Sequence, residues 1–143
     1  VIPGGLSTKV LPGDVIADCT MDYESLASAG SALGTGAVVV IAEGTCMVEL
    51  LKRSSRFYYV ENCGQCTPCR EGTGWLYRLL QKITQGKGQE SDLTLLVDVA
   101  NRIEGNTICA FGDAAAWPVQ SFIKHYYSEF EYMINNHGKS IAA

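Results

Sequence analysis

Residues 63–69 place three cysteines in seven positions, with two residues between neighbouring cysteines. The stretch reads Cys63-Gly64-Gln65-Cys66-Thr67-Pro68-Cys69. Thiolates at this spacing can bind neighbouring irons of one cubane iron–sulfur cluster from a single turn, and the last ligand of such a cluster can come from far along the chain. A further cysteine lies between two glycines near residue 109. The pattern therefore predicts a [4Fe–4S] site whose metal ligands are Cys63, Cys66, Cys69 and Cys109.

Zinc and disulfides are the alternatives for these cysteines. Zinc sites usually join two separated pairs of ligands, whereas here a third cysteine crowds the first pair and both histidines, His125 and His137, lie in the last predicted helix. Disulfide frameworks spread their cysteines along the chain, so the clustering favours metal ligands and a reducing compartment. Cys19 and Cys46, which are isolated among apolar residues, are predicted to be small core residues.

The composition narrows the class of protein. The chain has 143 residues, of which 47% are hydrophobic and 18% charged, as in a soluble globular protein. A net charge of −4 argues against nucleic acid as a partner, because no basic stripe is present. The longest apolar run, residues 37–42, is far shorter than the roughly 20 residues of a membrane span, so no direct membrane insertion is expected. The first residues resemble the interior of a domain, and we expect a fragment of a longer protein.

The chain divides into two parts of different character. Residues 1–43 are rich in turns, and short β-prone runs predict strands at 15–16 and 38–41. Residues 44–143 show helical periodicity and predict four helices, the last interrupted at Pro118. The predicted helix N-caps are Thr45, Thr67, Ser91 and Asp113. The glycine-rich segment 30–36 lacks the lysine of a phosphate-binding loop and is predicted to be a connection.

Side-chain contacts can also be expected from spacing. Glu49 and Arg53 are predicted to pair on the outer face of the first long helix. Arg70, next to the last clustered cysteine, should raise the reduction potential of a bound cluster. Asp113 is interpreted as a helix cap rather than a catalytic acid. The predicted buried stripe of the second helix comprises Trp75, Leu76, Leu79, Leu80 and Ile83.

Two segments resemble one known family. Residues 61–72 read Glu61-Asn62-Cys63-Gly64-Gln65-Cys66-Thr67-Pro68-Cys69-Arg70-Glu71-Gly72. This stretch resembles the signature of the NADH-binding flavoprotein subunit of respiratory complex I, known as its F subunit. Residues 107–120 resemble the segment that carries the fourth cluster ligand of that family, and residues 21–26 and 30–36 are also similar to it. Asn62 departs from the pattern, in which we expect serine.

The resemblance implies a fold and a function. The fold class is then mostly α, a C-terminal four-helix bundle carrying a [4Fe–4S] cluster, preceded by the end of a β-grasp (ubiquitin-like, SLBB-type) α+β domain. Residues 1–43 would be the C-terminal part of the β-grasp domain, and residues 44–143 the helical iron–sulfur domain. The function implied is electron transfer in an NADH:quinone oxidoreductase, with the cluster accepting single electrons from FMN reduced by NADH. The FMN and NADH site of the full-length subunit does not appear here, so the fragment alone should be inactive. Ala110 and Phe111 are expected to border the flavin.

The resemblance also implies partners and a location. The partners would be other peripheral-arm subunits of complex I, namely the thioredoxin-like [2Fe–2S] subunit and the large iron–sulfur subunit. The location would be cytoplasmic, on the inner face of the bacterial plasma membrane, or the matrix side in a mitochondrion. A diaphorase subunit of a soluble NAD-linked hydrogenase or formate dehydrogenase remains an alternative, although residues 117–120 favour complex I. A zinc-stabilised helical interaction module is the alternative without redox chemistry.

Overall fold

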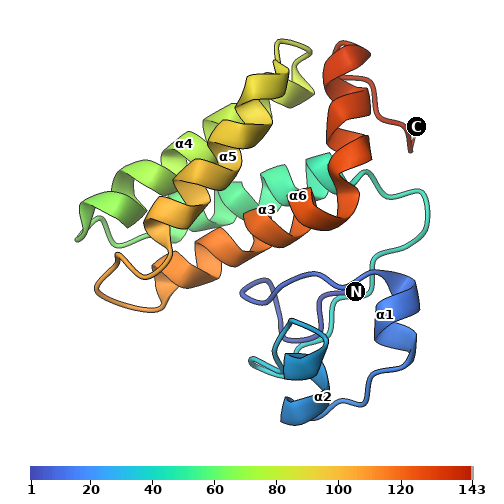
Figure 1. Cartoon of the computed structure of the whole chain (residues 1–143). Coiled ribbons are helices and arrows are strands. Elements are labelled where there is room, and N and C mark those ends of the chain that lie inside the picture. The colour runs from blue at the N-terminus through green and yellow to red at the C-terminus, as the bar shows by residue number, and fades with distance from the viewer. Residues whose placement is uncertain (143) are drawn as a thin grey trace.

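The computed structural model describes residues 1–142 and contains six helices within that range. Four long helices lie together in one part of the molecule, and two short ones lie in a smaller N-terminal lobe (Figure 1). The helices are α1 (Gly13–Ala17), α2 (Tyr23–Ser28), α3 (Met47–Glu61), α4 (Thr67–Thr84), α5 (Glu90–Ile103) and α6 (Phe111–Asn135). The mostly helical fold is therefore confirmed. No helix within residues 1–142 has the length and apolar character needed to cross a membrane.

The four long helices share one apolar core. Helix α4 packs on α3 and α5, while α6 contacts α3, α4 and α5. Most of the core comes from these helices, and Ile2 and Val10 of the N-terminal lobe join it. The lobe is also tied to the bundle by a hydrogen bond, since the Val10 N–H donates to Ser121 Oγ at 3.1 Å. The bundle and the lobe are thus packed against each other.

The strands predicted in the N-terminal part are wrong. Val15 and Ile16 lie in α1. Within residues 1–142 the run 38–41 makes only one isolated antiparallel bridge, in which Ile2 and Val39 exchange hydrogen bonds of 2.9 and 2.8 Å. Val38 is 47% and Val40 75% exposed, whereas Val39 and Ile41 are partly buried against the core. β-branched residues favour strands only where a partner strand covers them. The segment 30–36 is a loop, as predicted.

Helix α3 begins one residue later than its predicted cap suggests. Its N-cap is Cys46, whose Sγ accepts a hydrogen bond from the Glu49 N–H at 3.5 Å, and Thr45 lies outside the helix. A second cap comes from the other end of the chain, because the Met47 N–H donates to Glu129 Oε2 at 3.2 Å. Glu49 pairs with Lys52 at 2.7 Å, so the pairing predicted with Arg53 is wrong. Cys46 therefore acts as a cap at the edge of the core.

Helix α4 confirms most of its predicted core positions. Leu76, Leu80 and Ile83 are buried, but Trp75 is 52% exposed and its predicted burial is wrong. At the start of α5, Gln89 is the N-cap instead of Ser91, and its N–H donates to Asp92 Oδ2 at 2.7 Å. The short Gly86–Gly88 connection brings this cap close to the end of α4, where the ion pair of Lys82 Nζ with Asp92 Oδ2 spans 2.8 Å.

Helix α6 runs through Pro118 without the interruption predicted there. The backbone leaves helical geometry later, at Tyr126, with φ −124° and ψ 26°. Pro118 has no N–H to donate, and Ser121 Oγ donates to the nearby carbonyls of Trp117 and Pro118 at 2.9 and 3.2 Å. The kink at Tyr126 changes the direction of the second half of α6, which brings Glu129 to the start of α3.

Candidate metal centre

The four predicted cysteine ligands line one cavity of about 140 Å³. Three come from the connection between α3 and α4 and the start of α4, and the fourth comes from the loop between α5 and α6. Figure 1 shows both connections at the same end of the bundle. The cavity is lined by Glu61, Cys63, Gly64, Gln65, Cys66, Cys69, Thr107, Cys109, Phe111 and Gly112. Residues far apart in sequence therefore meet where the spacing pattern predicted a shared site.

The cavity is buried on one side and open on the other. Cys69 is buried, Cys66 is half-buried, and Cys63 and Cys109 are exposed. Burial, together with the negative charges that Cys66, Cys109 and Cys63 would carry, raises the pKa of the Cys69 thiol to about 11. A set of thiolates this close needs a positively charged occupant, which iron or zinc ions supply. All six cysteines of the chain are free thiols.

The start of α4 positions two of the thiols. Cys66 is the N-cap, and Thr67, predicted to be the cap, is the first helical residue, with Pro68 next to it in the first turn. The Arg70 N–H donates to the Cys66 carbonyl at 2.9 Å. Cys69 lies in the first turn, where backbone N–H groups lack helical partners and favour a nearby anion. The helix start therefore acts against burial, which holds Cys69 in the thiol form until a metal binds.

The loop between α5 and α6 is held by side chains from both of its ends. The Gly105 N–H donates to Asp113 Oδ1 at 2.7 Å, so Asp113 closes the loop, and α6 begins instead after Ala110. Thr107 Oγ1 donates to the Cys109 carbonyl at 2.9 Å. A Cβ added at Gly112 would lie only 2.4 Å from the Thr107 side chain, so glycine is needed for this close packing. These contacts fix Cys109 although its side chain is exposed.

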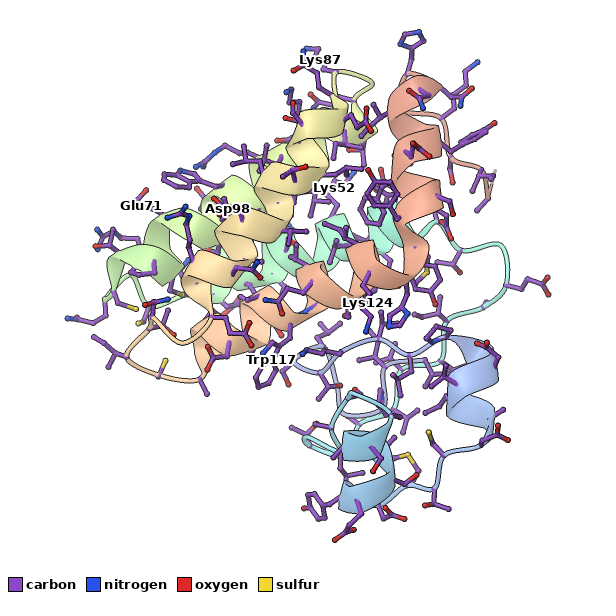
Figure 2. All side chains as sticks on the ribbon, viewed as in Figure 1. Lys52, Glu71, Lys87, Asp98, Trp117 and Lys124 are labelled. Atoms are coloured by element: carbon purple, nitrogen blue, oxygen red, sulfur yellow. The ribbon has the colours of Figure 1, made fainter. Side chains whose placement is uncertain are left out.

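Glu104 reinforces the same loop, a role that no sequence motif indicated. Its two carboxylate oxygens accept hydrogen bonds from Trp117 Nε1 at 2.6 Å and from Gln120 Nε2 at 2.7 Å. Hydrogen bonds from Gln120 and then Trp117 lower the pKa of the Glu104 carboxyl. Trp117 lies on α6 at the face near the N-terminal lobe (Figure 2). The end of α5 and the first turns of α6 are thereby joined across the base of the Cys109 loop.

Two of the remaining predicted residues lie beside the thiols. Phe111 lines the cavity, and its ring meets the Tyr58 ring edge-on at a centroid distance of 5.3 Å. Ala110 is exposed on the loop, and the flavin contact expected for both residues stays a prediction. Cys19 and Cys46 do not line the cavity. Within residues 1–142, no group of three or more His, Cys, Asp or Glu side chains is arranged to hold a single metal ion.

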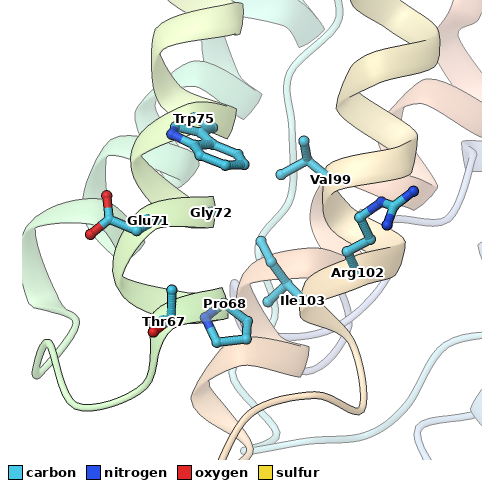
Figure 3. A pocket seen from close by; sticks show the side chains of 8 residues that line it. All are labelled: Thr67, Pro68, Glu71, Gly72, Trp75, Val99, Arg102 and Ile103. Atoms are coloured by element: carbon cyan, nitrogen blue, oxygen red, sulfur yellow. The ribbon is translucent and has the colours of Figure 1, made fainter.

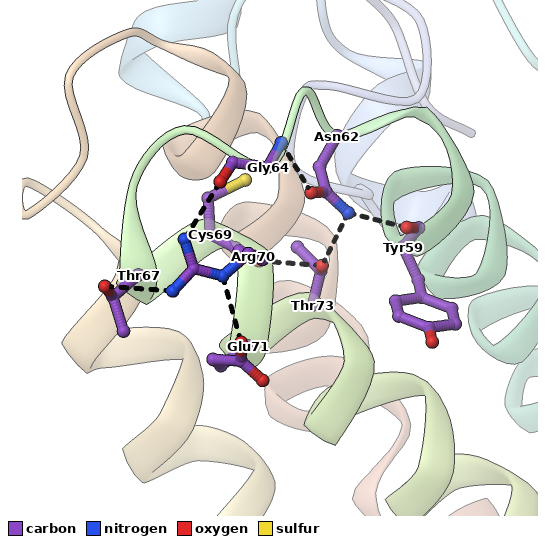
Figure 4. Close-up of polar contacts among 8 residues, drawn as sticks. All are labelled: Tyr59, Asn62, Gly64, Thr67, Cys69, Arg70, Glu71 and Thr73. Atoms are coloured by element: carbon purple, nitrogen blue, oxygen red, sulfur yellow. Dashed lines mark hydrogen bonds and ion pairs between the residues drawn. The ribbon is translucent and has the colours of Figure 1, made fainter.

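Arg70 is tied to the cysteine connection. Its Nη1 donates to the Gly64 carbonyl at 2.9 Å, and its Nε pairs with Glu71 Oε1 at 3.0 Å (Figure 4). Arg70 was expected to raise the reduction potential of a bound cluster through its positive charge. The Glu71 carboxylate offsets that charge. That effect on the potential stays a prediction.

A larger apolar hollow lies beside the site. It has a volume of about 350 Å³ between α4 and α5, and Trp75 on α4 faces Val99 and Ile103 on α5 across it (Figure 3). Pro68, in the first turn of α4, lies at one end. Trp75 is half exposed because its ring lies over this groove on the outside of the bundle and not in the core.

Fold and site together define a class, the small helical domains that gather cysteine thiols at one end of a helix bundle. The family described as the NADH-ubiquinone oxidoreductase-F iron-sulfur binding region matches residues 49–133, and the chain belongs to this family. The predicted family and the predicted iron–sulfur character are thereby confirmed.

Individual relatives agree with this assignment. The NADH-quinone oxidoreductase F subunit 1 of Rhizobium meliloti (strain 1021) is 48% identical over 140 residues, which cover 98% of this chain and 32% of that protein. The NADH-quinone oxidoreductase F subunit of Rickettsia bellii (strain OSU 85-389) is 48% identical over 131 residues, covering 92% of this chain and 31% of that protein. The chain thus spans about a third of the length of the curated relatives it matches.

A solved structure shares the fold. The crystal structure of the NAD+-reducing [NiFe]-hydrogenase in the H2-reduced state matches with a TM-score of 0.75 and 28% sequence identity. The match covers 92% of this chain and 22% of that hydrogenase chain.

Proposed function

We propose that this chain is the electron-transfer part of an NADH:quinone oxidoreductase, with Cys63, Cys66, Cys69 and Cys109 holding a [4Fe–4S] cluster. The observation that carries the proposal is the cavity lined by all four thiols. When bound, such a cluster takes single electrons from FMN that NADH has reduced and passes them on. Four thiols that line one cavity match in number the ligands of a cubane cluster, with one thiolate on each iron.

The protein's own residues then have three tasks. The first turn of α4 positions Cys66 and Cys69, and its free backbone N–H groups oppose the effect of burial on the Cys69 thiol. The α5–α6 loop brings Cys109 to the opposite wall. Phe111 and the buried start of α4 cover the inner side, which limits the access of water to that side of the site.

The rest of the proposal concerns the longer protein. FMN and NADH would bind in a part of it that this chain lacks, with Ala110 and Phe111 near the flavin. Residues 1–43 would end a β-grasp domain and residues 44–143 would form the cluster domain. The partners would be the thioredoxin-like [2Fe–2S] subunit and the large iron–sulfur subunit of the peripheral arm, on the cytoplasmic face of a bacterial membrane or the matrix side of a mitochondrial one. The oxidoreductase names of the relatives support this view.

A hydrogenase diaphorase is the second candidate function. It is favoured by the structural match to the NAD+-reducing [NiFe]-hydrogenase, while the 48% identity to the quinone oxidoreductase of Rhizobium meliloti against 28% to the hydrogenase favours the first candidate. The two differ in their neighbours, so the experiment is co-purification of the full-length protein from its host. Recovery with membrane-bound quinone-reducing activity supports the first candidate, and recovery with hydrogenase activity supports the second.

The cluster itself is tested by anaerobic purification of the chain. We expect a brown protein with about four irons and four sulfides per chain and an EPR signal on reduction. A colourless protein that holds one zinc ion would contradict the proposal and support the zinc-stabilised interaction module.

A further inference from the structure

The residue at the junction of α3 and the cysteine connection contacts three segments at once. Asn62 is the C-cap of α3, with φ −66° and ψ 143°. Its Nδ2 donates to the Tyr59 carbonyl at 2.6 Å, which anchors the side chain on the last turn of α3. Its Oδ1 accepts from the Gly64 N–H at 3.1 Å (Figure 4). This two-residue reach is the turn geometry that asparagine favours.

Gly64 is held on both of its backbone polar groups. The Gly64 N–H donates to Asn62 Oδ1, and Arg70 Nη1 donates to the Gly64 carbonyl at 2.9 Å. Gly64 has φ +77°, a left-handed conformation that has a low cost only for glycine. The turn that separates Cys63 from Cys66 is therefore fixed by one side chain from the end of α3 and another from the first turn of α4.

The same asparagine reaches toward the buried cysteine. Its Nδ2 lies 3.5 Å from Thr73 Oγ1, and Thr73 Oγ1 donates to the Cys69 carbonyl at 2.8 Å in the bundle interior. The contact to Thr73 is long and weak, but the bond from Thr73 to Cys69 is short. Asn62 thus contacts the turn at Gly64 directly and the buried backbone at Cys69 through Thr73.

We infer that Asn62 is a positioning residue that sets the cysteine turn before any metal enters. It does so by occupying the Gly64 N–H, so that this donor is not available to a bound cluster. The part of the inference that concerns the turn depends on the protein alone. The part that concerns the cluster rests on the proposed function.

The first test uses the metal-free chain. Amide hydrogen exchange at Gly64, followed by NMR, should accelerate about tenfold in Asn62→Ala, the factor expected for loss of one hydrogen bond. Asn136→Ala is the matched control, because Asn136 caps the end of α6 and its Nδ2 donates to the Tyr132 carbonyl at 2.8 Å, a helix-end bond formed on a different helix. We expect Gly64 exchange in this control to equal that of the unaltered chain.

Asn62→Asp tests the bond to Gly64 separately from the bond to Tyr59. It also replaces Asn62→Ala in this test if that variant does not fold. Aspartate keeps an oxygen that can accept from Gly64 but cannot donate to the Tyr59 carbonyl. Gly64 exchange should therefore stay within about twofold of the unaltered chain, on the same hydrogen-bond scale. Exchange that is unchanged in Asn62→Ala, or as fast in Asn62→Asp as in Asn62→Ala, would overturn the inference.

The second test follows loading with Fe²⁺ and sulfide. In Asn62→Ala the cluster should form more slowly and have a higher reduction potential, because the released Gly64 N–H can donate to cluster sulfur. The Asn136→Ala control should match the unaltered chain in both measurements. An unchanged rate and potential in Asn62→Ala would refute the role toward the cluster. If the unaltered chain itself takes up no iron, the proposed function fails, while the Gly64 exchange still decides the role of Asn62.

Discussion

The two walls of the cysteine cavity are built in different ways. The wall formed by residues 63–69 is held by neighbours in sequence, with Asn62 and Arg70 on either side of Gly64. The wall formed by the α5–α6 loop is held across longer separations, by Asp113 on Gly105 and by Glu104 on α6. The first wall follows from a local motif, whereas the second depends on how α5 and α6 pack.

Exposure of the thiols does not separate the two walls, because the first wall carries both the buried Cys69 and the exposed Cys63, and Cys109 on the second wall is also exposed. The contacts that hold the walls do separate them. Because the second wall depends on the packing of α5 and α6, substitutions there should lower stability as well as metal binding, whereas substitutions of ligands on the first wall should act mainly on metal binding. Three variants test this difference, and a fourth measures a site away from both walls.

The largest effect is expected for Cys66→Ser. The variant should lose nearly all cluster iron, because serine replaces a thiolate ligand. Its metal-free unfolding free energy should change by less than about 0.5 kcal/mol, since serine is itself a good N-cap for α4. Iron analysis after anaerobic loading and urea denaturation measure the two effects. Cys46→Ser is the matched control, a cap of α3 outside the cavity that should keep full iron. Equal iron in both variants would refute the ligand set.

Gly112→Ala should come next and act on the second wall. The new methyl would meet the Thr107 side chain at 2.4 Å, so the loop must shift. We expect a loss of about 1–3 kcal/mol in unfolding free energy, as for other overpacked sites, and faster loss of iron from the loaded protein. Gly13→Ala, where the methyl meets no atom within 4 Å, is the control. Equal stability of the two variants would show that the Thr107 contact does not hold the loop.

Glu104→Gln should have a smaller effect that depends on pH. The carboxyl has a lowered pKa in the folded state, so its stabilisation is full above the unfolded value near 4.3 and is lost as the pH falls through the folded value. At pH 7 the variant should lose about 1 kcal/mol, because an amide replaces a charged acceptor of two hydrogen bonds that solvent partly screens. Urea denaturation at pH 7 and pH 3 measures the difference, which should shrink in acid. Glu131→Gln, on an exposed part of α6, should show no such change.

The smallest effect is expected away from both walls, at Trp75→Ser. The side chain is 52% exposed over the groove between α4 and α5, so its loss should cost less than about 1 kcal/mol. Leu80→Ala on the same helix, where the side chain is fully buried, should cost about 2–5 kcal/mol. Thermal or urea unfolding of the two variants gives the comparison. A loss at Trp75 as large as at Leu80 would mean that the groove is covered in solution.

The sequence alone predicted the locally determined wall well. The spacing of the cysteines and the proline after Thr67 placed three candidate ligands at a helix start, and periodicity placed Leu76, Leu80 and Ile83 in the core. The contacts of Glu104 with α6 could not be predicted in this way, because they join residues 13 and 16 positions apart that meet only after α5 and α6 pack.

The errors have physical reasons of the same kind. The run 38–41 has high β propensity, but its pairing is limited to one bridge to Ile2 within the described range. Trp75 matched the apolar period of α4, yet it lies at the margin of the buried stripe, over the groove. Propensity and periodicity describe one segment at a time, and these outcomes depend on what lies opposite the segment.

The bond between Glu129 and the first turn of α3 affects how the chain is made. Ribosomes release the chain from its N-terminus, so α3 and the three clustered cysteines emerge long before Glu129. Until then the start of α3 lacks this cap, and the fourth cysteine also has yet to emerge for much of that time. The three clustered thiols are therefore made at least 40 residues before Cys109 (109 − 69), and the cavity that all four thiols line cannot form until that fourth cysteine has emerged.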